Sequence, residues 1–139
     1  MKKYLLVLVV MLLVVTGCGE KKLTCTLEED GQKATVTAKF GKDDIVTDVT
    51  MNMSMPFEKE LTDEEKEQME SYMGIVCAAF DYEGITCDTK MKDKSVDVVV
   101  EMNMAKMDAE TKEEMGYTDA EGTYDAMKKG MEESGYTCK

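Results

Sequence analysis

Methionine occurs at every second position in the segment VTMNMSM, residues 49–55, and the pattern returns in VEMNMAK, residues 100–106. Side chains two residues apart point to the same face of a β-strand. Met51, Met53 and Met55 would therefore align three thioether sulfurs, which are ligands that the soft ion Cu(I) accepts. The same spacing would also place methionines on the buried face of a strand. The segment thus poses a choice between a Cu(I) site and a core strand.

A cysteine near the N-terminus has a different chemistry. Lys2 and Lys3 precede an apolar run at residues 5–15, which is shorter than the roughly 20 residues of a membrane-spanning helix. This pattern is typical of the apolar region of a signal peptide. The following segment VTGC resembles the lipobox of bacterial lipoproteins, in which the cysteine becomes the first mature residue and carries diacylglycerol and palmitate. The resemblance implies a signal peptide at residues 1–17, a lipidation site at Cys18 and an extracytoplasmic, membrane-anchored protein.

Four cysteines remain after Cys18, namely Cys25, Cys77, Cys87 and Cys138. An even number of cysteines in an exported domain predicts disulfides. We favour the pairs Cys77–Cys87, across a chain reversal, and Cys25–Cys138, which would tie the chain ends. The pairs Cys25–Cys77 and Cys87–Cys138 stay open as the alternative.

The composition excludes several classes of function. Removal of residues 1–17 takes away Lys2 and Lys3, which leaves 15 basic and 29 acidic residues and a net charge of −14. Nucleic acids and anionic lipid surfaces both require clustered cations, so we expect neither as a partner. The chain has no histidine, the commonest general base, and a cysteine nucleophile would need such a base. We predict that the protein is not an enzyme, and a hydrolase with paired carboxylates is the third hypothesis.

The elements that position these residues follow from hydrophobic periodicity. Alternation with period two predicts strands near residues 23–27, 34–40, 45–55, 85–91 and 96–104. A capping box at residues 62–65 opens a helix that ends near Gly84, and a second helix runs from Thr123 to Gly135. Residues 108–116 are predicted to form a short helical turn between them. The residues expected in the core are Leu23, Cys25, Leu27, Ala34, Val36, Ala38, Phe40, Ile45, Val49, Met51, Met53, Met55, Val96, Val98, Val100, Met102 and Met104.

This order predicts one α+β domain at residues 23–139, after a short tether at residues 18–22. The sheet would be antiparallel with about five strands, and two helices would pack on one face. Shifted by 51 residues, Met51-Asn52-Met53 falls on Met102-Asn103-Met104. This faint repeat indicates either a duplicated unit of a hairpin and a helix or two similar units that converged.

The assigned faces decide between the two interpretations of the methionines. Without Met1 and Met11, the mature chain keeps 12 of its 14 methionines, and most of them fall on core faces. The chain has only 3 phenylalanines, and a flexible thioether suits the role of core filler. We therefore predict no metal site and no cofactor. Cu(I) binding through Met51, Met53 and Met55 is kept as the alternative function.

The opposite face of the sheet would be polar. Asn52 and Asn103 lie on it with Thr50, Ser54 and Glu101. A one-sided antiparallel sheet exposes such a face to water. The residues are therefore interpreted as a solvated face, with a binding surface as the alternative.

Several long segments resemble the YehR-like family of small bacterial lipoproteins. They are the lipobox, LTCTLEEDGQKATVTAKFGKDDIVTDVTMNM, YEGITCDTKMKDKSVDVVVEMNM and YDAMKKGMEESGYTCK. The resemblance implies an α+β fold and a membrane anchor, and it lends no active site. The four additional cysteines are not typical of the family, so the disulfides rest on this sequence alone. We expect a lipid-anchored binding or envelope-support module whose partner is a protein or a small ligand.

Overall fold

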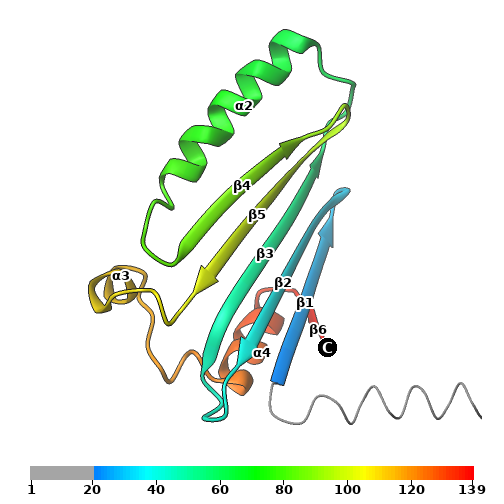
Figure 1. Ribbon diagram of the computed structural model, residues 1–139. Helices are drawn as coiled ribbons and strands as arrows, with labels where there is room; N and C mark the ends of the chain where they lie inside the picture. Colours follow the sequence, from blue (N-terminus) through cyan, green and yellow to red (C-terminus); the bar gives the residue numbers. More distant parts are fainter. Residues whose placement is uncertain (1–20) are drawn as a thin grey trace, which may run out of the picture.

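The computed structural model describes residues 21–139 of this chain (Figure 1). The signal peptide expected at residues 1–17 and the lipidation site expected at Cys18 lie outside the described residues. Within residues 21–139, the structure contains no helix with the length and hydropathy needed to cross a membrane.

The architecture is α+β, as predicted, but the sheet has six strands rather than five. The described elements are β1 (Lys21–Glu29), β2 (Gln32–Phe40), β3 (Val46–Pro56), α2 (Asp63–Ala78), β4 (Ile85–Met91), β5 (Ser95–Asn103), α3 (Ala109–Glu114), α4 (Tyr124–Glu133) and β6 (Thr137–Cys138). The strands lie in the order β4-β5-β3-β2-β1-β6, and all pairs are antiparallel. The sixth strand is the chain end, which pairs with β1. The described part of the chain has three helices: the two longer ones and a short helix at residues 109–114, within the segment where the sequence predicts a helical turn.

The two longer helices pack on the same face of the sheet, as predicted. α2 packs against β4, and a disulfide joins Cys77 of α2 to the inward-facing Cys87 of β4. α4 packs against β1 and β6, and the ring of Tyr124 meets the ring of Phe40 edge-on, with 5.3 Å between centroids. In Figure 1 the sheet is seen from its other side, with α4 behind it. No described helix covers that side.

The core lies between the sheet and these helices. The largest of the fully buried side chains there are Phe40, Leu23, Val96, Val100 and Cys25. All five belong to inward faces that the alternation predicts, and this part of the prediction is confirmed. Cross-strand pairing brings them together, since Cys25 faces Val36 on β2 and Val100 faces Met51 on β3.

The start of β1 and the register of β3 differ from the prediction. β1 begins at Lys21, so Lys21 and Lys22 pair with β2 instead of belonging to the tether at residues 18–22. On β3, a bulge opposite Lys39 and Phe40 changes the register. Val46 therefore takes the core position that was assigned to Ile45, which forms an isolated bridge with Thr123. Alternation alone does not reveal an extra residue in one strand.

The methionines of β3 are buried less than predicted. Met51 and Met55 are partly buried against the core, whereas Met53 is 36% exposed. The prediction of a core position is wrong for Met53 because α2 packs on β4 and α4 on β1 and β6, so neither helix packs over this part of β3. Conversely, Met107 is buried although no strand or helix pattern includes it.

Candidate ligand site on the helix-free sheet face

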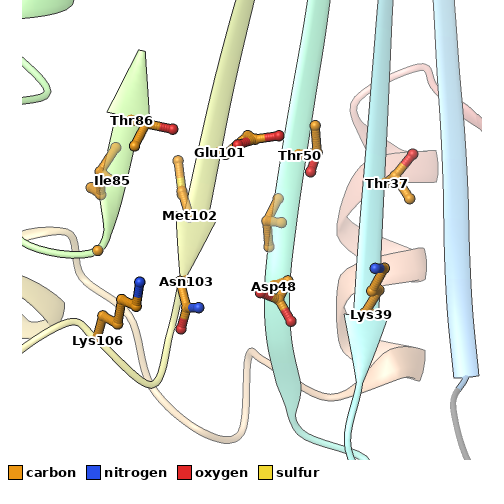
Figure 2. Close-up of a pocket in the computed structure, with 12 residues that line it drawn as sticks. Thr37, Lys39, Asp48, Thr50, Ile85, Thr86, Glu101, Met102, Asn103 and Lys106 are labelled. Carbon is orange, nitrogen blue, oxygen red and sulfur yellow. The ribbon is translucent and has the colours of Figure 1, made fainter.

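The side of the sheet without helices, called here the helix-free face, carries rows of polar side chains. Directly opposed residues of neighbouring strands point to the same face. One row consists of Thr24, Thr37, Thr50, Glu101 and Thr86, which come from five strands in the order β1, β2, β3, β5 and β4. Figure 2 shows the last four of these side chains projecting to the same side of the sheet.

A second row lies one step nearer the end of the sheet at which β1 begins. It contains Lys22, Lys39, Asp48 and Asn103. Lys106 follows on the turn after β5. Most of the two rows line a groove of about 400 Å³, called here the polar groove, which runs from β2 to the start of β4 (Figure 2). Its lining residues are Thr37, Lys39, Asp48, Val49, Thr50, Gly84, Ile85, Thr86, Glu101, Met102, Asn103 and Lys106.

A close approach of two chain segments forms the edge of the groove at β4 and β5. Gly84 has a φ of +88°, and a Cβ there would lie 2.8 Å from the carbonyl oxygen of Asn103. The N–H of Asn103 donates to the carbonyl oxygen of Gly84 over 2.7 Å. The side-chain oxygen of Asn103 accepts from the N–H of Ala105, which shapes the turn that carries Lys106. Only glycine permits this approach, because it lacks a Cβ and adopts positive φ without strain.

The charges in the groove are balanced, and within residues 21–139 they form no ion pairs. Lys39 and Asp48 are direct cross-strand partners, but no ion pair joins them. Within residues 21–139, Lys106 and Glu101 also have no ion-pair partner. The groove therefore presents two ammonium groups and two carboxylates with a formal sum of zero. This set fits a ligand that carries charges of both signs, or a neutral polar ligand.

The groove also contains the hydroxyl groups of three threonines. Within the described chain, no side-chain hydrogen bond involves Thr37, Thr50 or Thr86. A threonine hydroxyl offers one donor and two acceptor positions. The groove thus provides hydrogen-bonding groups of both kinds beside its charges.

A smaller hollow lies on the other face, where β1 and β2 join. It has a volume of about 120 Å³, and we call it the methionine hollow. The side chains of Leu27, Ala34, Met53 and Met55 face it from the same sheet face, as their cross-strand pairing requires. It lies in a part of the core layer that none of the described helices covers.

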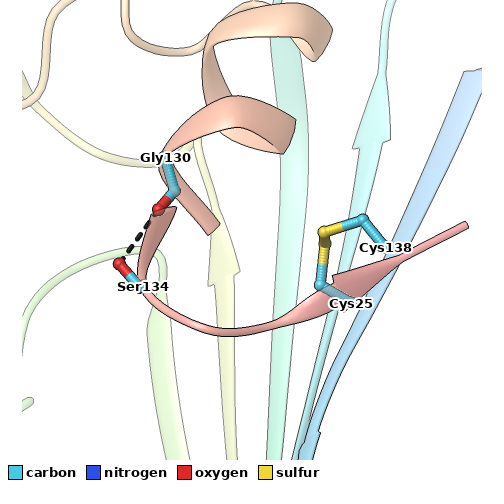
Figure 3. The surroundings of a disulfide bond; sticks show 4 residues. All are labelled: Cys25, Gly130, Ser134 and Cys138. Atoms are coloured by element: carbon cyan, nitrogen blue, oxygen red, sulfur yellow. Dashed lines mark hydrogen bonds between the residues drawn. A yellow bond between two sulfur atoms is a disulfide. The ribbon is translucent and has the colours of Figure 1, made fainter. Parts of the chain in front are cut away.

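The structure contains the two disulfides that the sequence favoured. Cys25 on β1 is bonded to Cys138 on β6, as Figure 3 shows beside the end of α4. Cys77 on α2 is bonded to Cys87 on β4. Disulfides form and persist in oxidising compartments, so the two bonds indicate an extracytoplasmic location.

Only some of the polar residues singled out in the sequence meet in the groove. Thr50, Glu101 and Asn103 line it, whereas Asn52 and Ser54 belong to rows farther along β3. The other polar residues of the groove were not singled out as site candidates from the sequence: Thr37, Lys39, Asp48, Thr86 and Lys106. The polar half of the strand alternation was the available signal for the first four, but it does not say which strands become neighbours.

Three carboxyl groups outside the groove have lowered pKa values with structural causes. The Lys59 ammonium and the backbone N–H of Thr62 lower the pKa of Glu65 to about 2. A hydrogen bond from Lys92 lowers the pKa of Asp97, and the backbone N–H of Thr111 lowers that of Asp108. A general acid at neutral pH needs a raised pKa instead. These shifts therefore belong to helix caps and an ion pair. Among residues 21–139, no group of three His, Cys, Asp or Glu side chains is arranged to hold a metal ion.

Comparison with known proteins supports the fold. No protein-family model matches the sequence, and no curated protein matches it. Among solved structures, the chain is similar to the NMR structure of the E. coli YehR protein, with a TM-score of 0.67 and 15% sequence identity. The match covers 86% of this chain and 90% of the YehR chain. The YehR-like fold that the sequence segments indicated is thus confirmed, and at this identity the similarity concerns the fold alone.

Proposed function

We propose that this chain is a lipid-anchored extracytoplasmic protein that binds a polar ligand in the groove of its helix-free face. One observation carries the proposal: the groove collects two ammonium groups, two carboxylates and three hydroxyls that have no partner within residues 21–139. Polar side chains that only keep a surface soluble need not gather in one groove. Ligand sites characteristically place a few polar groups in a concavity on a preformed scaffold.

The anchor on Cys18 is the second part of the proposal. The lipobox-like segment VTGC supports it, and the two disulfides support a location outside the cytoplasm. The protein would act through binding or as a support in the cell envelope, without enzymatic activity of its own.

Ligand binding is tested by NMR on the ¹⁵N-labelled mature chain with Cys18→Ser. Three polar probes are titrated separately: N-acetylglucosamine, the dipeptide Gly-Gly and glycerol phosphate. At least one probe is expected to shift the amide signals of Thr37, Thr50 and Glu101, and Glu101→Gln is expected to weaken the effect.

The matched control is Asp88→Asn, which changes a carboxylate of the same face outside the groove. It should leave the titrations unchanged. Signal shifts that avoid the groove with every probe would refute the binding site.

Lipidation is tested by labelling cells with radioactive palmitate. The intact chain should incorporate the label, and Cys18→Ala should abolish it. The double variant Cys77→Ala/Cys87→Ala removes two other cysteines and should keep the label. Label that persists in Cys18→Ala would contradict the anchor.

Cu(I) binding is the second candidate, and the exposure of Met53 favours it. Met53 and Met55 line the same hollow, which brings together two thioether side chains of the kind that a soft ion accepts as ligands. A Cu(I) competition titration on the oxidised protein tests this candidate. The Cu(I) site would be established if Cu(I) binds in the absence of free thiols and Met53→Leu removes the binding. Absence of such binding would leave the methionines as core side chains.

A further inference from the structure

We propose that the polar groove binds the phosphoethanolamine head group of a membrane phospholipid. The inference rests on the proposed function, because it names the ligand of that same groove. Two features of the groove support this ligand: its position along the strands and the types of charge that line it.

The groove lies at the anchor end of the sheet. β1 begins at Lys21, and Lys22 pairs directly with Lys39 in the groove. Neighbouring strands are about 4.8 Å apart, so the groove starts one strand spacing from β1. The three residue steps from Cys18 to Lys21 span at most about 10 Å when the chain is fully extended. With Cys18 anchored in a bilayer, the groove comes within reach of the lipid head groups.

The charges select a zwitterionic head group over an anionic one. Lys39 and Lys106 offer two donors to a phosphodiester, while Asp48 and Glu101 offer acceptors to an ammonium. Because these four charges cancel, a ligand of net zero charge replaces water without leaving a charge uncompensated. A purely anionic head group would face both carboxylates in a protein that already carries an excess of acidic residues.

The lining also selects a primary ammonium over a quaternary one. Quaternary ammonium groups are recognised by aromatic cages, and the groove has no aromatic lining residue. Carboxylates and threonine hydroxyls accept N–H donors, which ethanolamine has and choline lacks. Thr37, Thr50 and Thr86 add such acceptors along the row next to the charges.

The experiment titrates the ¹⁵N-labelled mature chain with Cys18→Ser with soluble head-group probes. The probes are glycerophosphoethanolamine, glycerophosphocholine, glycerophosphoglycerol, inorganic phosphate and ethanolamine. Glycerophosphoethanolamine should give the lowest Kd and shift signals in the groove. Lys39→Gln and Lys106→Gln should each raise this Kd about tenfold, since each removes a charge-assisted hydrogen bond. Lys90→Gln, on the same face outside the groove, should leave it unchanged.

The role of the carboxylates has its own readout. Asp48→Asn should abolish the preference for glycerophosphoethanolamine over glycerophosphoglycerol while the fold, followed by the amide spectrum, stays intact. A preference that survives in Asp48→Asn and in Glu101→Gln would overturn the assigned ammonium site.

A vesicle arm identifies the source of the head group. The same chain should sediment with vesicles of equal parts phosphatidylcholine and phosphatidylethanolamine, and less with phosphatidylcholine alone or with phosphatidylglycerol added. Binding of the free head group without vesicle binding would overturn a membrane lipid as the ligand. Groove shifts by N-acetylglucosamine or Gly-Gly, with none by glycerophosphoethanolamine, would refute this inference and leave the proposed function standing. Absence of groove shifts with all probes would refute both.

Discussion

At the scale of single residues, the exposure of a side chain depends on which neighbours reach it. The methionines of this protein illustrate the point, since the same residue type serves in the core and at the surface. Met73 is 5% exposed, whereas Met53 is 36% exposed on a stripe that also carries partly buried methionines. Met53 is therefore far more accessible to solvent, oxidants and soft ions than Met73.

Oxidation with hydrogen peroxide should distinguish these methionines. We expect Met53 and Met115 to form sulfoxides first, because oxidation requires access to the sulfur. Met73, Met104 and Met107 should react much later, after the protein unfolds. Peptide mapping by mass spectrometry at successive times gives the order. Met53 reacting as slowly as Met73 would mean that the methionine hollow is covered in solution.

At the scale of elements, α2 is the helix whose start the sequence specifies best. Thr62 is its N-cap, and the Thr62 hydroxyl accepts from the N–H of Glu65. The Glu65 carboxylate accepts from the N–H of Thr62 and pairs with Lys59, so the predicted capping box is confirmed. The cap is formed with the ionised carboxylate, which gives this helix end a pH dependence.

The contribution of the Glu65 carboxylate to the stability of the protein should be lost as the pH falls. The pKa of Glu65 is lowered to about 2 from its ordinary value of 4.5. A lowered pKa in the folded state stabilises the protein above the ordinary value, and the contribution disappears as the pH falls from 4.5 towards 2. The urea midpoint of the wild type should therefore be higher than that of Glu65→Gln at pH 7. The difference should vanish as the pH approaches the lowered pKa of Glu65, about 2.

A neighbouring acidic position on the same helix gives the control for this titration. Glu67→Gln removes an exposed carboxylate that takes no part in the cap. It should change the midpoint little at any of these pH values. A constant difference between wild type and Glu65→Gln across the acid range would exclude the capping carboxylate as its cause.

At the scale of the whole molecule, the two disulfides constrain the chain very differently. Cys25–Cys138 joins residues 113 positions apart and holds the last strand against β1. Cys77–Cys87 joins residues 10 positions apart and holds α2 on β4. In the chain-entropy model the longer loop gives more stability, because it removes more freedom from the unfolded chain.

Double replacement of each cysteine pair by alanine measures this difference. The model gives about 5 kcal/mol for the Cys25–Cys138 loop and about 3 kcal/mol for the Cys77–Cys87 loop. Removal of the long-range bond should thus lower the free energy of unfolding by about 2 kcal/mol more. Guanidinium denaturation of both double variants gives the two values. Equal losses would indicate that local packing, and not loop length, decides the contribution.

The sequence predicted the helices, the strands and the inward face of each strand more reliably than it predicted where strands begin and which part of the sheet the helices cover. The inward positions of Leu23, Phe40 and Val100 follow from period-two alternation, and their burial is confirmed. The helix cap at Thr62 follows from a local motif that the structure contains. The bulge that moves Val46 into the core was not predictable, because it depends on how two strands match in length and register.

The composition and local patterns by themselves determined the α+β class, the polar and apolar faces and the favoured cysteine pairs of this protein. Only the tertiary structure decided that Lys39, Asp48, Glu101 and Lys106 meet in one groove, and that Met53 stays open to solvent. The physical reason is that alternation fixes the side of a strand to which each residue points. The order of strands and the positions of the helices are fixed by long-range packing, which no local pattern contains.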